Sequence, residues 1–183
     1  MTYSIRYEGQ LSIECPLNRR EIRALTAFFD TRRIQTRGGP LDSRRLSSAD
    51  PDVIDYNRPP EGQPGLFCDL EVSEDGTVLR WGGDSSSGKP DLDKWIIYVI
   101  DHLLKPGAEF DIRERNFDLT GMSDEDLLHY FTFDHYVSGH LVGTASETGE
   151  VWKIVVKDNE VSTEKVHLDL AAPHGDEDED EGE

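Results

Sequence analysis

Residues 66–81, which read LFCDLEVSEDGTVLRW, carry the pattern that decides the fold class. Every second side chain from Leu66 to Val72 is apolar, and a second strand-like run extends from Val78 to Trp81. Alternation with a period of two is typical of half-buried strands. The pair Asp75-Gly76 stands between the two runs, and an Asp-Gly pair in that position is the strongest short-range signal of a hairpin. The segment therefore predicts two adjacent antiparallel strands.

Strand-like alternation recurs towards both ends of the chain. Residues 3–13 alternate between apolar and polar side chains, which predicts a half-buried strand with one face in solvent. Three further strand-like runs follow in the C-terminal third, at residues 135–145, 151–157 and 160–168. Their short, turn-rich connections predict a β-meander, so about six strands are expected in all.

Two helices are predicted between these strands. Asn18, followed three residues later by Glu21, resembles a capping box, and an apolar stripe continues to Phe29. Asp91 is expected to cap a second helix, because apolar side chains recur at helical spacing from Leu92 onwards. This helix should end before Pro106-Gly107.

The order of these elements predicts the fold. A short third helix is expected from Ser123 through Tyr130, but strands and helices do not alternate as they do in parallel βαβ units. We therefore expect a single α+β domain over residues 1–170. It should contain a mostly antiparallel sheet of about six strands, with two or three helices packed on one face.

Chain length and cysteine content restrict the class of protein to which the chain can belong. At 183 residues the chain is long enough for one domain with its own core. Cys15 and Cys68 lie at no disulfide-framework or zinc spacing, so both are predicted to be buried thiols in a reducing compartment. The N-terminus does not resemble a leader, and no apolar run approaches the ~20 residues that span a bilayer. A cytoplasmic location without membrane contact is expected.

The net charge of −19 is unevenly distributed along the chain. The last eight residues, DEDEDEGE, hold seven acids, so the rest of the chain carries 31 acids against 19 bases, or −12. Like charges at that density cannot bury enough apolar surface to offset the entropy of ordering, so residues 171–183 are predicted to be disordered. An acidic body repels other polyanions, and direct binding to nucleic acid is therefore not expected.

An arginine-rich segment interrupts this acidic chain. Eight arginines and only three acids lie between Arg19 and Arg45, and residues 30–65 form a long polar loop without periodicity. A loop of that length is usually functional or disordered. A guanidinium presents a planar fork of donors that matches a carboxylate or a phosphate. The predicted binding residues are therefore the loop arginines, Arg32, Arg33, Arg37, Arg44 and Arg45.

Two other interpretations of the arginines stay open, because the segment lacks interleaved aromatic residues. Arg19, Arg20 and Arg23 can lie on the solvent face of the first helix while the loop arginines neutralise the acidic body. The acidic tail can also fold back onto the loop and compete with a partner. Salt would weaken such a contact, since the Debye length is ~8 Å at physiological ionic strength.

No cluster in the sequence forms a complete catalytic site. Residues 83–89, GDSSSGK, have the skeleton of a phosphate-binding loop, but Pro90 stands where that loop needs Ser or Thr. Cys68 shares its strand parity with core residues, which predicts an inert thiol. No cofactor is therefore predicted.

The histidines give a similarly incomplete metal site. His129, His135 and His140 are the closest set, with Asp134 nearby. On a regular strand, His135 and His140 would point to opposite faces, unless Gly139 hosts a bulge. No metal is predicted.

Three motifs occur in order along the chain. Residues 72–81 join a D-G-T hairpin to a tryptophan, residues 95–106 run from Trp95 to Leu-Lys-Pro, and residues 156–161 read VKDNEV. In this order they resemble an uncharacterised family of small phage and bacterial, including actinobacterial, accessory proteins. The chain departs from the family's pattern between Gly83 and Asp91 and carries an insertion between Phe110 and Phe133. The resemblance implies a phage or mobile-element origin and transfers no functional residue.

Three functional hypotheses follow. The first is a non-enzymatic phage or mobile-element accessory protein that binds a host macromolecule through the loop at residues 30–65 and an acidic face, with a host protein as the expected partner. The second is an acidic mimic of nucleic acid that occupies the groove of a DNA- or RNA-binding enzyme. The third is a metal- or nucleotide-dependent enzyme that uses the histidines at 129–140 or the loop at 83–89.

Overall fold

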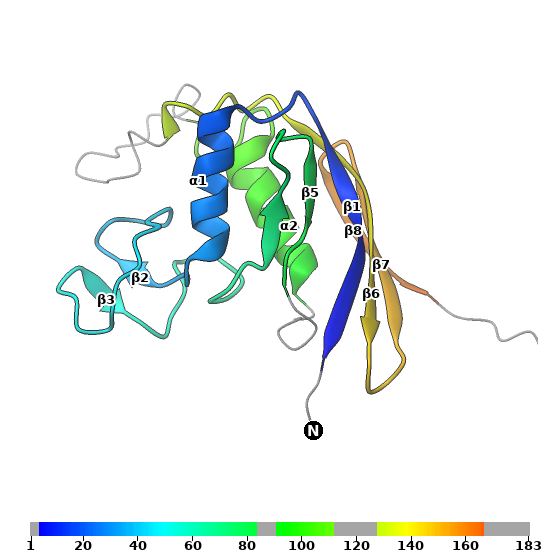
Figure 1. The fold of residues 1–183 in the computed structure, drawn as a ribbon, viewed down its shortest axis with the longest axis horizontal. Coiled ribbons are helices and arrows are strands. Elements are labelled where there is room, and N and C mark those ends of the chain that lie inside the picture. Colours follow the sequence, from blue (N-terminus) through cyan, green and yellow to red (C-terminus); the bar gives the residue numbers. More distant parts are fainter. Residues whose placement is uncertain (1–3, 84–90, 112–127, 167–183) are drawn as a thin grey trace, which may run out of the picture.

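The protein folds around one six-stranded antiparallel sheet, with two helices on one of its faces (Figure 1). The computed structural model describes residues 4–83, 91–111 and 128–166. This architecture confirms the predicted single-domain α+β fold. In the order in which they pair, the strands are β4 (Leu70–Val72), β5 (Val78–Trp81), β1 (Ile5–Glu14), β6 (Tyr136–Ala145), β7 (Val151–Lys157) and β8 (Glu160–Val166).

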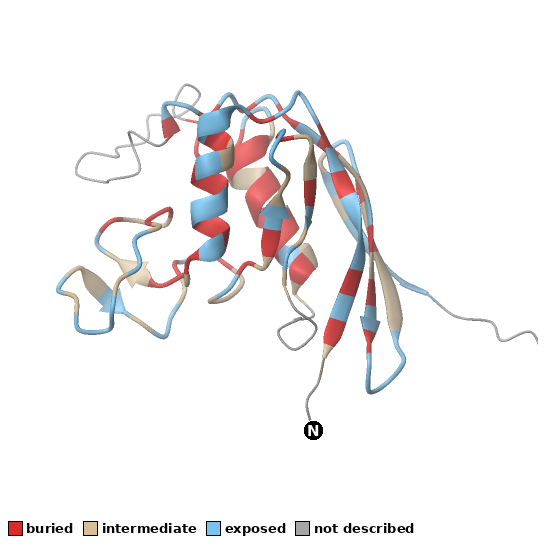
Figure 2. Ribbon diagram, in the orientation of Figure 1, coloured by how far each residue is buried: buried red, intermediate tan, exposed pale blue. Residues whose placement is uncertain are grey.

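The long strands β1 and β6 form the centre of the sheet. They pair without a break from Ile5 opposite Ala145 to Glu14 opposite Tyr136. Alternate β1 residues, among them Ile5 and Leu11, are buried, whereas Arg6 and Ser12 on the other face are exposed (Figure 2). The predicted hairpin and meander are both confirmed, because β4 pairs with β5, β6 with β7, and β7 with β8.

Helix α1 (Arg19–Asp30) begins at the predicted capping box. The Asn18 side chain accepts hydrogen bonds from the backbone N–H groups of Arg20 and Glu21, each at 2.9 Å, and Glu21 Oε1 accepts from the Asn18 N–H at 2.9 Å. These bonds satisfy donors that a helix start otherwise leaves unpaired. Leu25 and Phe28 lie on the buried face of the helix.

The second helix begins after Asp91 and ends before Pro106, as predicted, but two of its details were not expected. Helix α2 (Leu92–Val99) begins after Asp91, but the Asp91 side chain makes no capping hydrogen bond. The helix continues as a π-helical turn, η1 (Ile100–Leu104), in which the Lys105 N–H donates to the Ile100 carbonyl at 3.1 Å. Trp95, Ile96 and Val99 face the core.

The polar segment after α1 is mostly irregular, but part of it forms regular structure. It contains a second, two-stranded sheet of β2 (Gln35–Thr36) and β3 (Val53–Asp55), which lies beyond the end of α1 in Figure 1. Local side-chain hydrogen bonds stabilise its turns, which short-range alternation cannot reveal.

Several sequence predictions concern residues that the structure does not describe. They are the phosphate-loop skeleton except Gly83, most of the short helix at 123–130, and the acidic tail.

Of the two cysteines, Cys68 is buried as predicted, but Cys15 is exposed, which corrects the prediction for that residue. None of the helices in the described part of the chain is long and apolar enough to cross a membrane.

Candidate binding site

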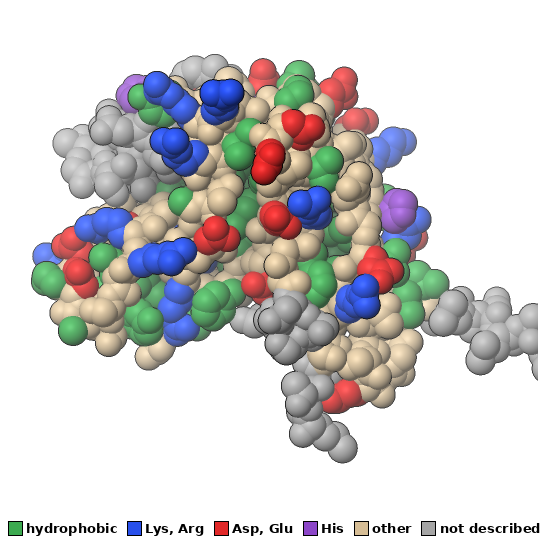
Figure 3. All heavy atoms as spheres, in the orientation of Figure 1, with side chains coloured by type: hydrophobic (Ala, Val, Ile, Leu, Met, Phe, Trp, Pro, Cys, Tyr) green, Lys and Arg blue, Asp and Glu red, His purple; other side chains and the backbone are tan. Residues whose placement is uncertain are grey.

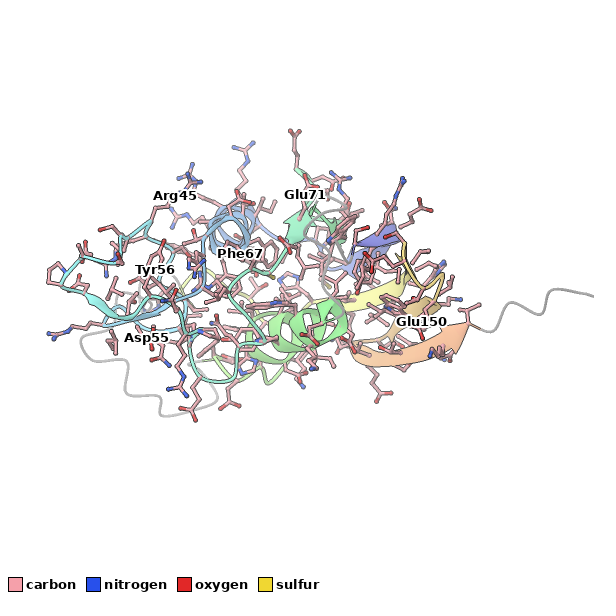
Figure 4. The ribbon with its side chains drawn as sticks, turned by 90° about the horizontal axis from the view of Figure 1, so that it is seen from below. Arg45, Asp55, Tyr56, Phe67, Glu71 and Glu150 are labelled. Carbon is pink, nitrogen blue, oxygen red and sulfur yellow. The ribbon has the colours of Figure 1, made fainter. Side chains whose placement is uncertain are left out.

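A groove of about 420 Å³ opens where the end of α1 meets the folded segment that follows it. Arginines and apolar or aromatic side chains share its walls, and Asp30 and Thr31 also line it. We call it the arginine–aromatic groove; its principal lining residues are Arg32, Ile34, Arg44, Arg45, Leu46, Tyr56 and Phe67. Figure 4 shows Arg45, Tyr56 and Phe67 at the same end of the molecule, far from Glu150 on the sheet.

Arg32, which lines this groove, contacts two aromatic rings. Its guanidinium carbon lies 4.7 Å from the centroid of the Tyr56 ring and 5.4 Å from that of Phe67. Its Nε donates to the Tyr56 carbonyl at 3.2 Å, and Nη2 donates to Asn57 Oδ1 at 3.2 Å. Cation–π contacts and fixed hydrogen bonds lower the entropy that the guanidinium loses when it binds an anion.

The other two arginines of the groove differ in whether their guanidinium groups are already engaged in ion pairs. Arg44 donates to Asp42 through Nε at 3.0 Å and Nη2 at 2.8 Å, and Nη1 contacts Asp52 at 2.9 Å. Burial acts to raise the pKa of Asp42, but hydrogen bonds from Arg44 and Thr36 outweigh it and leave that pKa below its usual value. Arg45, in contrast, is exposed and forms no ion pair within the described part of the chain.

Arg33 is fully buried and therefore lies beneath the groove rather than on its surface. Its guanidinium stacks on Phe28, 4.0 Å from the ring centroid, and Nη2 donates to the Pro40 carbonyl at 2.7 Å. Nε donates to Gln63 Oε1 at 3.3 Å, and the Gln63 amide also donates to Tyr98 Oη at 3.1 Å. Arg33 thus anchors the segment after α1 to the helices of the core.

The five arginines predicted from the sequence therefore occupy three environments. Arg32, Arg44 and Arg45 line the groove, Arg33 is buried beneath it, and Arg37 is exposed but does not line it. Sequence reasoning missed Tyr56 and Phe67, because the aromatic partners of Arg32 are 24 and 35 residues away along the chain. Tyr56 stood out only as an isolated aromatic residue in the polar segment, and Phe67 lay within a predicted strand.

The helix arginines form a separate positive area. Arg19, Arg20 and Arg23 are exposed on the solvent face of α1, as one interpretation predicted. Figure 3 shows Lys and Arg side chains gathered over α1 and around the segment that contains β2 and β3. Arg20 lies over Tyr130, with its guanidinium carbon 3.8 Å from the ring centroid.

Among the described residues, a buried polar cluster at the start of α1 comes nearest to a catalytic arrangement. His135 Nε2 lies 2.7 Å from Glu21 Oε2 and 3.1 Å from Thr132 Oγ1, and Nδ1 contacts the Cys15 carbonyl. Burial by itself lowers the pKa of His135, but the hydrogen bonds to Glu21 and Cys15 raise it above its usual value.

This cluster lacks the geometry of a nucleophilic triad. In a triad the acid and the nucleophile contact opposite ring nitrogens, whereas here Glu21 and Thr132 both contact Nε2. The side chain of His135 is only 1% exposed, so a substrate has no route to it. The cluster therefore ties the start of α1 to the segment that precedes β6.

The histidines that lie closest in the sequence are not brought together as one site. His135 is buried, whereas His140 is exposed on the other face of β6, and the continuous register through Gly139 excludes the bulge that would have joined them. Among the described residues, no group of three His, Cys, Asp or Glu side chains could hold a metal ion.

Comparisons with protein-family models, with curated proteins and with solved structures found no match for this chain.

Proposed function

We propose that this protein is a non-enzymatic binding protein whose arginine–aromatic groove holds an acidic segment of a partner protein. The observation that carries the proposal is Arg32, fixed between Tyr56 and Phe67 beside the exposed Arg45. Aromatic and arginine side chains are the residues that most often dominate binding energy at protein interfaces.

The chemistry of the walls favours a polypeptide over a nucleic acid. Ile34, Leu46 and Phe67 offer apolar contact beside the guanidinium groups, which suits carboxylates interspersed with apolar side chains. A nucleic acid would bring many phosphates towards a protein with a net charge of −19, and repulsion would oppose that approach. A short acidic segment, in contrast, places its negative charge only at the groove and not against the rest of the acidic surface.

The proposal is tested by fluorescence anisotropy with a short fluorescein-labelled peptide in which glutamate alternates with leucine. An Arg32→Gln/Arg45→Gln variant should bind it at least about tenfold more weakly than the wild type, a loss of about 1.4 kcal/mol. The matched control, Arg19→Gln/Arg23→Gln, removes the same charge from the solvent face of α1 and should bind like the wild type. Equal weakening by both variants would refute a groove-specific interaction.

A pull-down from a plausible host lysate then tests for a natural partner. The same two variants serve as bait at low and at high salt, and a protein captured through the groove should be lost from the groove variant alone. A phage or mobile-element origin, and hence a host protein as the partner, rests on the sequence resemblance and stays a prediction.

No specific observation favours either of the two alternative functions, the nucleic-acid mimic or the enzyme. Several surface carboxylates are already engaged in ion pairs, such as Glu71 with Arg80 and Glu150 with Lys165. A nucleic-acid mimic instead needs carboxylates that are free to meet a basic groove, so this hypothesis remains an untested prediction. The enzyme hypothesis remains a prediction too, since residues 84–90 lie outside the described structure.

A further inference from the structure

Phe67 separates the arginine–aromatic groove from a second, smaller pocket of opposite charge. It lines both, and 43% of its surface is exposed. The second pocket, here called the aromatic pocket, contains about 20 Å³, which is room for one water-sized group. The residues that define its chemistry are Tyr7, Phe67, Asp69, Trp81, Asp91 and Trp95.

Packing behind the rings holds these walls in place. Tyr7 and Trp81 meet edge to face, with centroids 5.7 Å apart and planes at 64°, and Tyr7 contacts Trp152 in the same way at 5.9 Å. Trp95 is buried against Phe28, with centroids 6.2 Å apart. A cation gains most from rings that are already fixed, because no side-chain entropy is lost on binding.

The aromatic pocket has two acids among its lining residues. Asp69 and Asp91 both line it, and Asp91 forms an ion pair with Lys94 at 3.0 Å. The side chains of Lys94 and Asp91 are 64% and 44% exposed, so exchanging Lys94 for another cation has a small free-energy cost. Burial raises the pKa of Tyr7, and the nearby charges of Asp93 and Asp91 raise it further, so its hydroxyl stays neutral.

We propose that the aromatic pocket binds the primary ammonium group of a lysine side chain. An ammonium head has about the size of a water molecule, the aliphatic stem suits the ring walls, and the carboxylates balance the charge. A neutral packing gap would not need two acids among its lining residues. What the inference says about the partner rests on the proposed function. The partner segment would place acidic residues in the groove on one side of Phe67 and a lysine in the aromatic pocket on the other side.

The pocket is tested apart from the groove with n-butylammonium, an analogue of the lysine side chain. Two of the chain's three tryptophans line the pocket, so their indole N–H signals in NMR spectra report on it directly. Saturable shifts of the Trp81 and Trp95 signals are expected, with a Kd on the order of millimolar for so small a ligand. The uncharged 1-butanol should give no saturable shift.

Two variants locate the site. Asp91→Asn removes a carboxylate that makes no helix-capping hydrogen bond, so the fold should survive and the affinity for n-butylammonium should fall several-fold. Asp55→Asn, on β3, removes an exposed carboxylate that lines neither the groove nor the pocket and should leave the affinity unchanged.

Shifts of equal size with 1-butanol, no saturable shift, or equal effects of the two variants would each overturn the inference. The groove variant Arg32→Gln/Arg45→Gln should bind n-butylammonium normally. Failure of the acidic peptide to bind the wild type would refute the proposed function and leave the ammonium result standing.

Discussion

Replacing Glu21 with alanine should destabilise the protein more than any surface substitution. Glu21 Oε2 lies 2.7 Å from His135 Nε2, and Oε1 accepts the Asn18 N–H at 2.9 Å, so one carboxylate serves both a buried ion pair and a capping box. Removing one member of a buried pair costs about 3–5 kcal/mol, and losing part of a helix cap costs about 1 kcal/mol. We therefore expect a loss of roughly 4–6 kcal/mol, out of a total stability that is roughly 5–15 kcal/mol for a domain.

Urea unfolding followed by tryptophan fluorescence measures this loss. Glu21→Gln keeps an oxygen that can accept a hydrogen bond but removes the charge, and should cost about 1–2 kcal/mol. A Glu21→Ala variant within about 0.5 kcal/mol of the wild type, the range usual for surface substitutions, would refute the structural role assigned to the cluster.

The His135–Glu21 pair also predicts how the free energy of unfolding changes with pH. The pKa of His135 is higher in the folded than in the unfolded protein. The His135–Glu21 pair therefore makes its full contribution to the free energy of unfolding below the unfolded pKa of about 6.5, and this contribution is lost as the pH rises through the folded pKa. Wild-type stability should therefore fall with rising pH above neutrality more steeply than that of Glu21→Gln. Parallel pH profiles for the two proteins would contradict the assignment.

Three further predictions follow from single residues. Asn18→Ala removes the side-chain cap of α1 and should lower the free energy of unfolding by about 1 kcal/mol, measured in urea. Gly9→Ala should lower the midpoint of thermal unfolding, because Gly9 has φ +106° and a Cβ there would lie 2.6 Å from the His140 carbonyl oxygen; Gly65→Ala, in open space, is the control. In the native protein Cys15 should react with a thiol reagent at once, whereas Cys68, whose burial raises its pKa, should react only on unfolding.

Local signals in the sequence predicted most of the elements correctly. The Asn18–Glu21 box starts α1, and Asp75-Gly76 turns the hairpin, where Gly76 has φ +72°. Both depend on residues within a few positions of each other, so short-range patterns contain the necessary information.

Contacts between distant segments could not be predicted in this way. Nothing local indicates that β1 pairs with both β5 and β6, or that Arg33 is buried against Phe28 while its neighbour Arg32 faces a groove. The candidate site depends on the same kind of contact. Tyr56 and Phe67 reach Arg32 only after the segment between α1 and β4 has folded.

NMR titration with the glutamate–leucine peptide tests the binding proposal most directly, because it locates the contact without any substitution. Backbone amide shifts should concentrate at Arg32, Arg45 and Phe67 and should weaken as salt is added. Shifts centred on Arg19 and Arg23 of α1, or no shifts at low salt, would contradict it.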